Sequence, residues 1–318
     1  MLIGANLPDL DVLAYLGGPA ADLSFRRGWT HGVLALAVLP FLLTAVVLSS
    51  DALVRRLGRA TLPSTVVPRQ VLFLSACSIL THPILDSLNT YGVRWLMPFS
   101  GRWFYGDALF IVDPWLWLAL GLGLCLGRSR RRSRKNVLAA ARSARLGLLI
   151  ATAYSIGMAV SGAVAGRLAT GELTTLTGEP VEALMAGPLP VTPLVRDIVA
   201  VQPNGYRVAR FHWLRHPHLD PGTLRSFHRG TPASMEAQSA ARTLTGRRFL
   251  GWARFPVFRT ESRPDGAALV HIFDLRYTDR PGVGFGAVTI PVMIPPASGS
   301  SGDSLPSSSA GGPAAPVP

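Results

Sequence analysis

Long apolar segments constrain the fold of this 318-residue chain more than any other feature. Four of them are long enough to cross a bilayer, which takes about 20 residues in a helix. They cover residues 32–50, 70–88, 109–127 and 146–166. The sequence therefore predicts a mainly α fold, with a polytopic helical membrane core of four spans over residues 1–166.

The second half of the chain has a different composition. From residue 167 onward, charged residues, prolines and glycines return, and short segments with strand-like patterning follow. These segments are residues 206–215, 247–258, 268–277 and 284–294, and residues 233–244 predict a short helix. We expect a small α+β domain over residues 167–296. A tail rich in Ser, Gly, Pro and Ala over residues 297–318 predicts disorder.

The arginines predict the orientation in the membrane. Arg55, Arg56, Arg59 and Arg69 lie between the first and second segments, and the run RSRRRSRK (128–135) lies between the third and fourth. Clusters of this kind beside apolar segments mark the cytoplasmic side. The net charge of +13 therefore does not indicate a nucleic-acid partner. We expect a multi-pass protein of the bacterial inner (cytoplasmic) membrane with an extracytoplasmic C-terminal domain.

Polar residues gather at the expected outer ends of these spans. In THPILDSLNTYG (81–92), His82 and Asp86 are four residues apart and share one helix face. Uncompensated polar groups at membrane depth are costly, so such a pair marks a functional site. The expected topology brings further polar residues to the same level: Asp9, Asp11, Arg26, Arg27, His31, Asp107 and Asp113.

A mixed set of histidines and carboxylates without cysteine suits a divalent ion such as Zn²⁺, Mn²⁺, Fe²⁺ or Mg²⁺. Such an ion lowers the pKa of water enough for attack on an ester or phosphoester near neutral pH. Arg27 or Arg26 would bind an anionic group, and Asp107 or Asp113 would serve as general base. Plainer interpretations stay open, because Asp113 before Pro114 also fits a helix N-cap and Asp107 an ordinary loop position.

Two other groups of residues do not predict a functional site. Four histidines of the second half, His212, His216, His218 and His228, lie near a loop, and only Asp220 accompanies them, so we expect no metal there. Cys77 and Cys125 both lie in apolar segments without paired spacing, and we expect them to act as small hydrophobic residues.

Several ordered motifs resemble a known family. PDLD (8–11), RRGWTHG (26–32), THPILDSLNTYG (81–92) and the MPF, YGD and DPW steps (97–115) resemble the YdjM-like membrane-bound metal-dependent hydrolases, also described as LexA-binding, inner-membrane-associated hydrolases. The resemblance covers residues 1 to about 127. It implies a helical membrane core and a further N-terminal helix with a Thr-His pair ahead of residue 1. The metal ligands that it implies are drawn from Asp9, Asp11, His31, His82 and Asp86.

Together these features predict a membrane-bound metal-dependent hydrolase. It would act at the extracytoplasmic interface, among membrane lipids, on an amphiphilic ester or phosphoester such as a phospholipid or a polyprenyl phosphate. The alternative is a non-catalytic polytopic membrane protein with a structural or ion-binding polar cluster and a partner-binding outer domain. A transporter is disfavoured, because the charges gather at one interface and no inverted repeat is visible.

Overall fold

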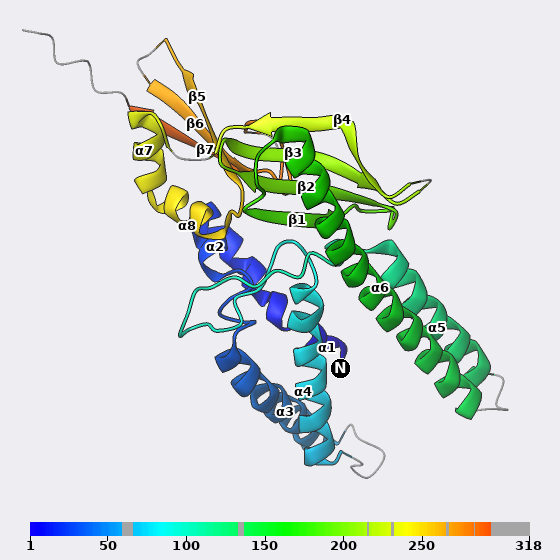
Figure 1. The fold of residues 1–318 in the computed structure, drawn as a ribbon. Coiled ribbons are helices and arrows are strands. Elements are labelled where there is room, and N and C mark those ends of the chain that lie inside the picture. The colour runs from blue at the N-terminus through cyan, green and yellow to red at the C-terminus, as the bar shows by residue number, and fades with distance from the viewer. Residues whose placement is uncertain are drawn as a thin grey trace, which may run out of the picture.

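The computed structural model describes residues 1–58, 66–132, 137–214, 216–229, 232–264, 267–282 and 284–293. The predicted tail over residues 297–318 lies outside this part of the chain. Two pairs of long helices extend in the same general direction from a body that contains the β-sheets (Figure 1). The loop after the first pair and the N-terminal short helices lie between that pair and the sheets.

The N-terminal half is helical. Its elements are α1 (Leu2–Asn6), the 3₁₀ helix η1 (Pro8–Gly17), α2 (Pro19–Phe25), α3 (Val33–Arg56), α4 (Pro68–Ser87), α5 (Pro114–Arg132) and the start of α6 (Val137–Thr177). Prolines at the first helical position, as in α4 and η1, are favoured because that position needs no hydrogen-bonded N–H. Arg55 and Arg56 end α3, where cations interact favourably with the helix dipole.

Two helices in the described part of the chain are long and apolar enough to span a membrane, Val33–Arg56 and Leu138–Thr177. Within the most apolar 18-residue stretch of each helix, only 11% and 17% of the residues are buried. Their apolar side chains therefore face outward instead of filling a protein core. The predicted polytopic core with four spans is therefore wrong. His82 and Asp86 lower the mean hydropathy of α4, and the apolar stretch of α5 ends where arginines begin at Arg128.

The C-terminal part is mostly β-sheet, so the expected α+β composition overstated its helix. One antiparallel sheet has the order β1 (Ala183–Pro188), β2 (Val195–Gln202), β3 (Gly205–His212), β4 (His218–Phe227), and the second has the order β5 (Pro256–Ser262), β6 (Ala267–Asp274), β7 (Ala287–Met293). Two short helices, α7 (Met235–Arg242) and α8 (Leu244–Trp252), precede the second sheet. The predicted strand over residues 247–258 was half wrong, because its first part belongs to α8.

Helix α6 contains the second candidate membrane span and leads directly to the sheets. It continues past the predicted end at residue 166, and Ala165, Ala169 and Leu173 present one face of it to the first sheet. The other face of that sheet packs on the second sheet, and α7 and α8 cover the second sheet from the far side. Tyr91, from the loop after α4, is buried in this last core. The loop that follows α4 is therefore held by the C-terminal part of the chain.

Candidate metal centre

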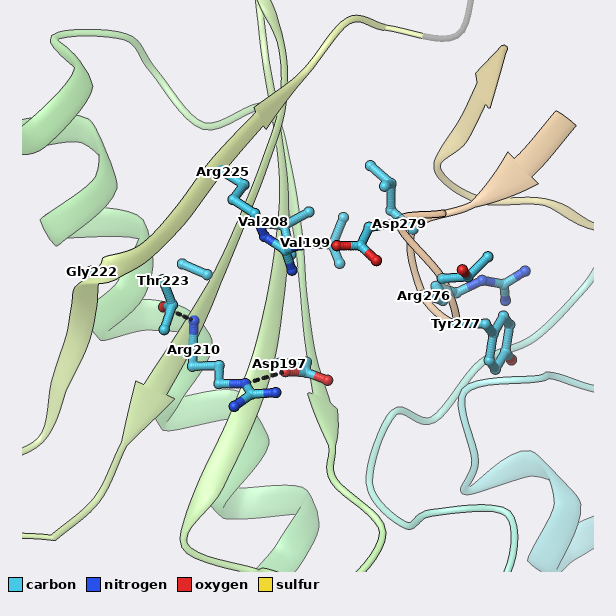
Figure 2. A pocket seen from close by; sticks show the side chains of 13 residues that line it. Asp197, Val199, Val208, Arg210, Gly222, Thr223, Arg225, Arg276, Tyr277 and Asp279 are labelled. Carbon is cyan, nitrogen blue, oxygen red and sulfur yellow. Dashed lines mark hydrogen bonds and ion pairs between the residues drawn. The ribbon is translucent and has the colours of Figure 1, made fainter. Parts of the chain in front are cut away.

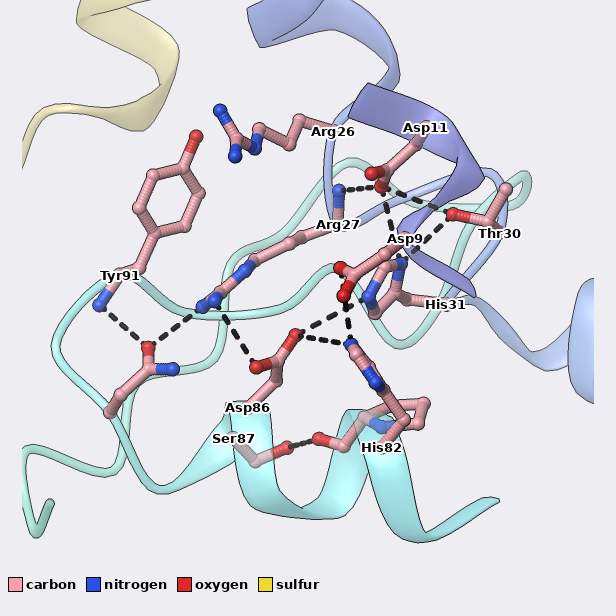
Figure 3. Close-up of polar contacts among 12 residues, drawn as sticks. Asp9, Asp11, Arg26, Arg27, Thr30, His31, His82, Asp86, Ser87 and Tyr91 are labelled. Atoms are coloured by element: carbon pink, nitrogen blue, oxygen red, sulfur yellow. Dashed lines mark hydrogen bonds and ion pairs between the residues drawn. The ribbon is translucent and has the colours of Figure 1, made fainter. Parts of the chain in front are cut away.

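Three N-terminal elements bring histidines and carboxylates together (Figure 3). His31 lies in the turn before α3, His82 lies on α4, and their ring centres are 5.3 Å apart. Asp9, from η1, completes a set whose ligand-type atoms all lie within 4.8 Å of one another. His31 is fully buried, whereas the side chain of Asp9 is 57% exposed, so the cluster is closed behind His31 and open beside Asp9.

The atoms that face one another are those that bind metals. Asp86 Oδ2 lies 3.3 Å from His31 Nε2 and 3.4 Å from His82 Nε2, and His82 Nε2 lies 3.2 Å from Asp9 Oδ1. These are ion-pair distances, yet the two Nε2 atoms and Asp86 Oδ2 are buried without a hydrogen-bond partner among the described residues. A tetrahedral ion with ligands at about 2.0–2.1 Å places its ligand atoms about 3.3–3.4 Å apart. The residues present therefore fit a divalent ion.

The other ring nitrogens are already engaged. His82 Nδ1–H donates to the carbonyl oxygen of Ala5 at 2.6 Å. His31 Nδ1 lies 2.9 Å from the Thr30 hydroxyl, which donates to Asp11 Oδ2 at 3.1 Å, so His31 Nδ1–H is the donor of this pair. In a neutral imidazole, a hydrogen bond from Nδ1 leaves the Nε2 lone pair free, which is the arrangement found in histidines that bind metals.

Arg27 positions the aspartate of α4. Its Nη2 lies 3.1 Å from Asp86 Oδ1, and its Nη1 donates to Asn89 Oδ1 at 2.9 Å. Its backbone N–H donates to Asp11 Oδ2 at 2.6 Å, and its φ of 49° is unusual for a residue other than glycine. The guanidinium is thus committed to Asp86 and Asn89. It orients Asp86, whereas the sequence had suggested that Arg27 binds an anionic group of the substrate.

The charges shift the pKa values of the cluster strongly. Burial alone would lower the pKa of His82, but Asp86 and Asp9 raise it to about 10. Burial opposes the same effect at His31, whose pKa is raised by Asp11 and Asp86. The pKa of Asp86 is lowered by the two histidines and Arg27 against the effect of burial, and the neighbouring His82 lowers the pKa of Asp9. With a pKa of about 10, His82 carries a proton on Nε2 near neutral pH, and a metal ion would have to displace that proton.

The structure places three predicted site residues away from the shared centre. Asp11 faces Nδ1 of His31 at 3.3 Å and so stands behind the histidine. Asp107 forms an ion pair with Arg254, whose Nη1 lies 2.8 and 2.9 Å from its two carboxylate oxygens. Asp113 Oδ1 accepts from the backbone N–H groups of Trp115 and Leu116, both at 3.1 Å, which confirms the N-cap interpretation. Neither Asp107 nor Asp113 reaches the cluster as a general base.

Sequence reasoning missed Tyr91, although it lies within the motif of residues 81–92. Its ring centre is 4.6 Å from the guanidinium carbon of Arg27, within range for a cation–π contact. The guanidinium carbon of Arg26, the neighbouring arginine, lies 5.9 Å from the centre of the same ring (Figure 3). The side chain of Arg26 is 33% exposed and pairs with Asp22 at 3.5 Å. Of the two arginines, Arg26 is the one available to a ligand.

A second hollow, of about 310 Å³, lies between the first sheet and residues 275–279 (Figure 2). Its charged side chains pair with one another, Arg210 with Asp197 at 3.6 Å and Arg225 with Asp279. Because these charges already have partners, this hollow is a weaker candidate than the cluster around His31 and His82.

Comparison with known proteins adds one match. The sequence model of the YdjM inner membrane protein family matches residues 1–164, which is more than half of the chain. The match includes every residue of the cluster and confirms the resemblance predicted from the motifs. Neither a curated protein nor a solved structure matches.

Proposed function

Because this chain belongs to the YdjM inner membrane protein family, we propose that it is a membrane-bound metal-dependent hydrolase of amphiphilic esters or phosphoesters. The family and the two helices that can span a bilayer indicate a membrane protein. The reaction, the ion and the side of the membrane are the proposed parts.

One observation carries the proposal. His31 Nε2, His82 Nε2 and Asp86 Oδ2 are buried and face one another at ion-pair distances of 3.3 and 3.4 Å, and none of them makes a hydrogen bond to another described residue. Buried polar atoms normally have partners, because an unpaired one costs about 1–3 kcal/mol. A divalent cation would satisfy all three atoms at once. The arrangement is therefore better explained as a binding site than as a structural polar cluster.

The residues divide into two groups by role. His31, His82, Asp86 and Asp9 would hold a divalent ion such as Zn²⁺, Mn²⁺, Fe²⁺ or Mg²⁺, which supplies Lewis acidity and lowers the pKa of water. Asp11 holds His31 from behind through Thr30. Arg27 holds Asp86 through the carboxylate oxygen that faces away from the histidines. The exposed side at Asp9 is where substrate would approach.

The arginines support an extracytoplasmic site. Arg55 and Arg56 end α3, and exposed Arg128 lies near the end of α5. Both helix ends lie far from the β-sheets and the cluster (Figure 1). Since arginines favour the cytoplasmic side, the cluster and the sheets would lie outside the cytoplasm. A substrate at that interface would be amphiphilic.

Metal content and hydrolysis test the proposal together. Purified full-length protein should carry close to one equivalent of divalent metal, and His31→Ala and His82→Ala should lose it. The loaded protein should hydrolyse p-nitrophenyl esters or phosphoesters in detergent, and the two variants should not. His228→Ala is the matched control and should keep both properties. A wild-type protein that retains no metal from any of the four ions would contradict the proposal.

The alternative function is a metal-binding or structural cluster without catalysis. The observation in its favour is that Asp9 pairs with His82 and Asp11 with His31, so these charges are partly balanced without an ion. Stoichiometric metal together with inactivity on both ester classes would favour this alternative.

A further inference from the structure

A groove of about 530 Å³ lies beside the cluster, between helices α2 and α8, Gly282 and residues 284–289. Its volume lies in the range of about 300–1,000 Å³ that is typical of small-molecule sites. Tyr91 and Arg26 belong to its wall, and the Tyr91 ring contacts Arg27, which holds Asp86. The groove therefore begins one side chain away from the metal ligands.

Two polar groups in the groove are available to a ligand. Tyr91 is 4% exposed and lines the groove, and its hydroxyl makes no hydrogen bond within the described part of the chain. Arg26 makes a 3.5 Å contact with Asp22, and its guanidinium carbon lies 5.9 Å from the centre of the Tyr91 ring. A partly exposed ion pair of this kind contributes about 0–1 kcal/mol. A ligand anion can therefore recruit Arg26 at little cost. Tyr91 O–H can donate to the same anion.

The rest of the wall is aromatic and comes from the C-terminal part. Trp252 and Phe285 lie with their ring centres 4.9 and 5.8 Å from that of Tyr91, and the Trp252 indole N–H donates to the Tyr91 carbonyl at 3.2 Å. Gly284 and Gly286 flank Phe285 with φ of 84° and 85°, a conformation that glycine adopts without strain, and Phe285 is 52% exposed. This wall suits a ring or another apolar body.

We propose that this groove binds the non-reacting part of the substrate, a phosphate group carried on a ring or apolar body. Arg26 and Tyr91 O–H bind the phosphate, and Trp252 and Phe285 pack against the body that carries it. A guanidinium binds a phosphate group through two parallel, charge-assisted hydrogen bonds. The proposal rests on the hydrolase function, since it names the substrate class of the same site. It also gives the C-terminal part of the chain, outside the family match, a role in specificity.

The test measures binding without hydrolysis. Full-length protein in detergent and EDTA is titrated by calorimetry with phenylphosphonate, a soluble ring phosphonate, and with dihexanoyl phosphatidate, a short-chain lipid. Wild type should bind at least one probe saturably. The probe that binds more tightly shows whether the phosphate group belongs to a soluble molecule or to a lipid. Arg26→Gln should weaken binding about tenfold or more, the loss typical of a bidentate arginine contact, and Arg26→Lys should restore part of it. Tyr91→Phe, which keeps the ring contact with Arg27, should weaken binding about threefold to tenfold.

The matched control is Arg259→Gln, which removes the same charge from an exposed position of β5 outside the groove and should bind as wild type does. Absence of saturable binding to both probes, or equal affinity in wild type and Arg26→Gln, would overturn the proposal. The metal content of the same preparations, measured before EDTA is added, separates this result from the hydrolase hypothesis. A metal-free protein whose phosphonate binding depends on Arg26 would keep the groove and reject the hydrolase. A metal-loaded protein without such binding would reject the groove proposal and leave the hydrolase hypothesis standing.

Discussion

The molecule contains two pairs of histidines with a nearby aspartate, and they differ in what surrounds them. His31 and His82 are buried or half-buried, with ring centres 5.3 Å apart and Asp86 Oδ2 3.3–3.4 Å from both Nε2 atoms. His212 and His218 stack at 5.9 Å on neighbouring strands, and Asp220 lies 3.9 Å from one of them.

The surroundings explain why only one pair is a candidate site. In the first pair both Nδ1 atoms are held by Ala5 and Thr30, so both Nε2 atoms point to one place. In the second pair, His218 Nδ1 contacts the carbonyl of His216, and the side chain of His212 is 36% exposed to competing water. Residue type is equal in the two pairs. The supporting contacts and the exclusion of water differ, and both are features that favour metal binding.

The strongest test of this difference is the aspartate of each pair. Asp86→Asn should weaken metal affinity more than about 100-fold, because loss of a ligand exceeds the 10–100-fold cost of losing a supporting residue. Asp220→Asn should leave metal content unchanged. Competition with a chromogenic chelator measures both affinities. Equal metal content in the two variants would remove the distinction between the pairs.

The next test removes the carboxylate that holds a histidine in place without removing a proposed metal ligand. Asp11→Asn keeps His31 but weakens the charge behind its Nδ1, and metal affinity should fall about 10–100-fold. The same chelator titration measures it. An affinity lower than that of Asp86→Asn would instead make Asp11 a direct ligand.

Arg27 offers a milder change of the same kind. Arg27→Lys keeps the charge but loses the paired contacts to Asp86 and Asn89, so metal affinity should fall about tenfold. Arg210→Lys, at the ion pair with Asp197, is the control and should have no effect on metal. An Arg27→Lys variant with wild-type affinity would show that Asp86 does not depend on Arg27 for its position.

Asp113 tests whether a buried carboxylate outside the cluster is structural. It is 4% exposed, caps the start of α5 and accepts a hydrogen bond from Tyr154 at 3.0 Å. Asp113→Ala should lower the free energy of unfolding by about 1 kcal/mol, the usual loss for a helix cap. Thermal unfolding followed by tryptophan fluorescence measures this. Metal affinity should stay at the wild-type value, and a loss of metal would return Asp113 to the site.

The smallest effect is expected at the exposed pair. His218→Ala should change stability by no more than about 0.5 kcal/mol, as most surface substitutions do, and should leave metal content unchanged. Loss of a metal equivalent in this variant would reveal a second site and break the comparison.

Much of the site could be predicted because local spacing determines it. The four-residue interval between His82 and Asp86 places both on one helix face wherever α4 lies. The apolar segments predicted the membrane, and the family motifs predicted which residues meet. The count of four spans was wrong, because the polar residues of α4 and the arginines in the last turns of α5 leave neither helix with a stretch apolar enough to cross a bilayer.

Other features were decided only by the tertiary structure. Whether Asp11 faces the ion or the back of His31 depends on how η1 packs beside the turn before α3. Asp107 is paired because Arg254, distant in sequence, folds against it. The groove joins Arg26 to Trp252 and Phe285 from the opposite end of the chain. Sequence spacing determines which residues share a helix or strand, but partners from distant segments meet only through packing, and packing decides which polar atoms stay free to bind a ligand.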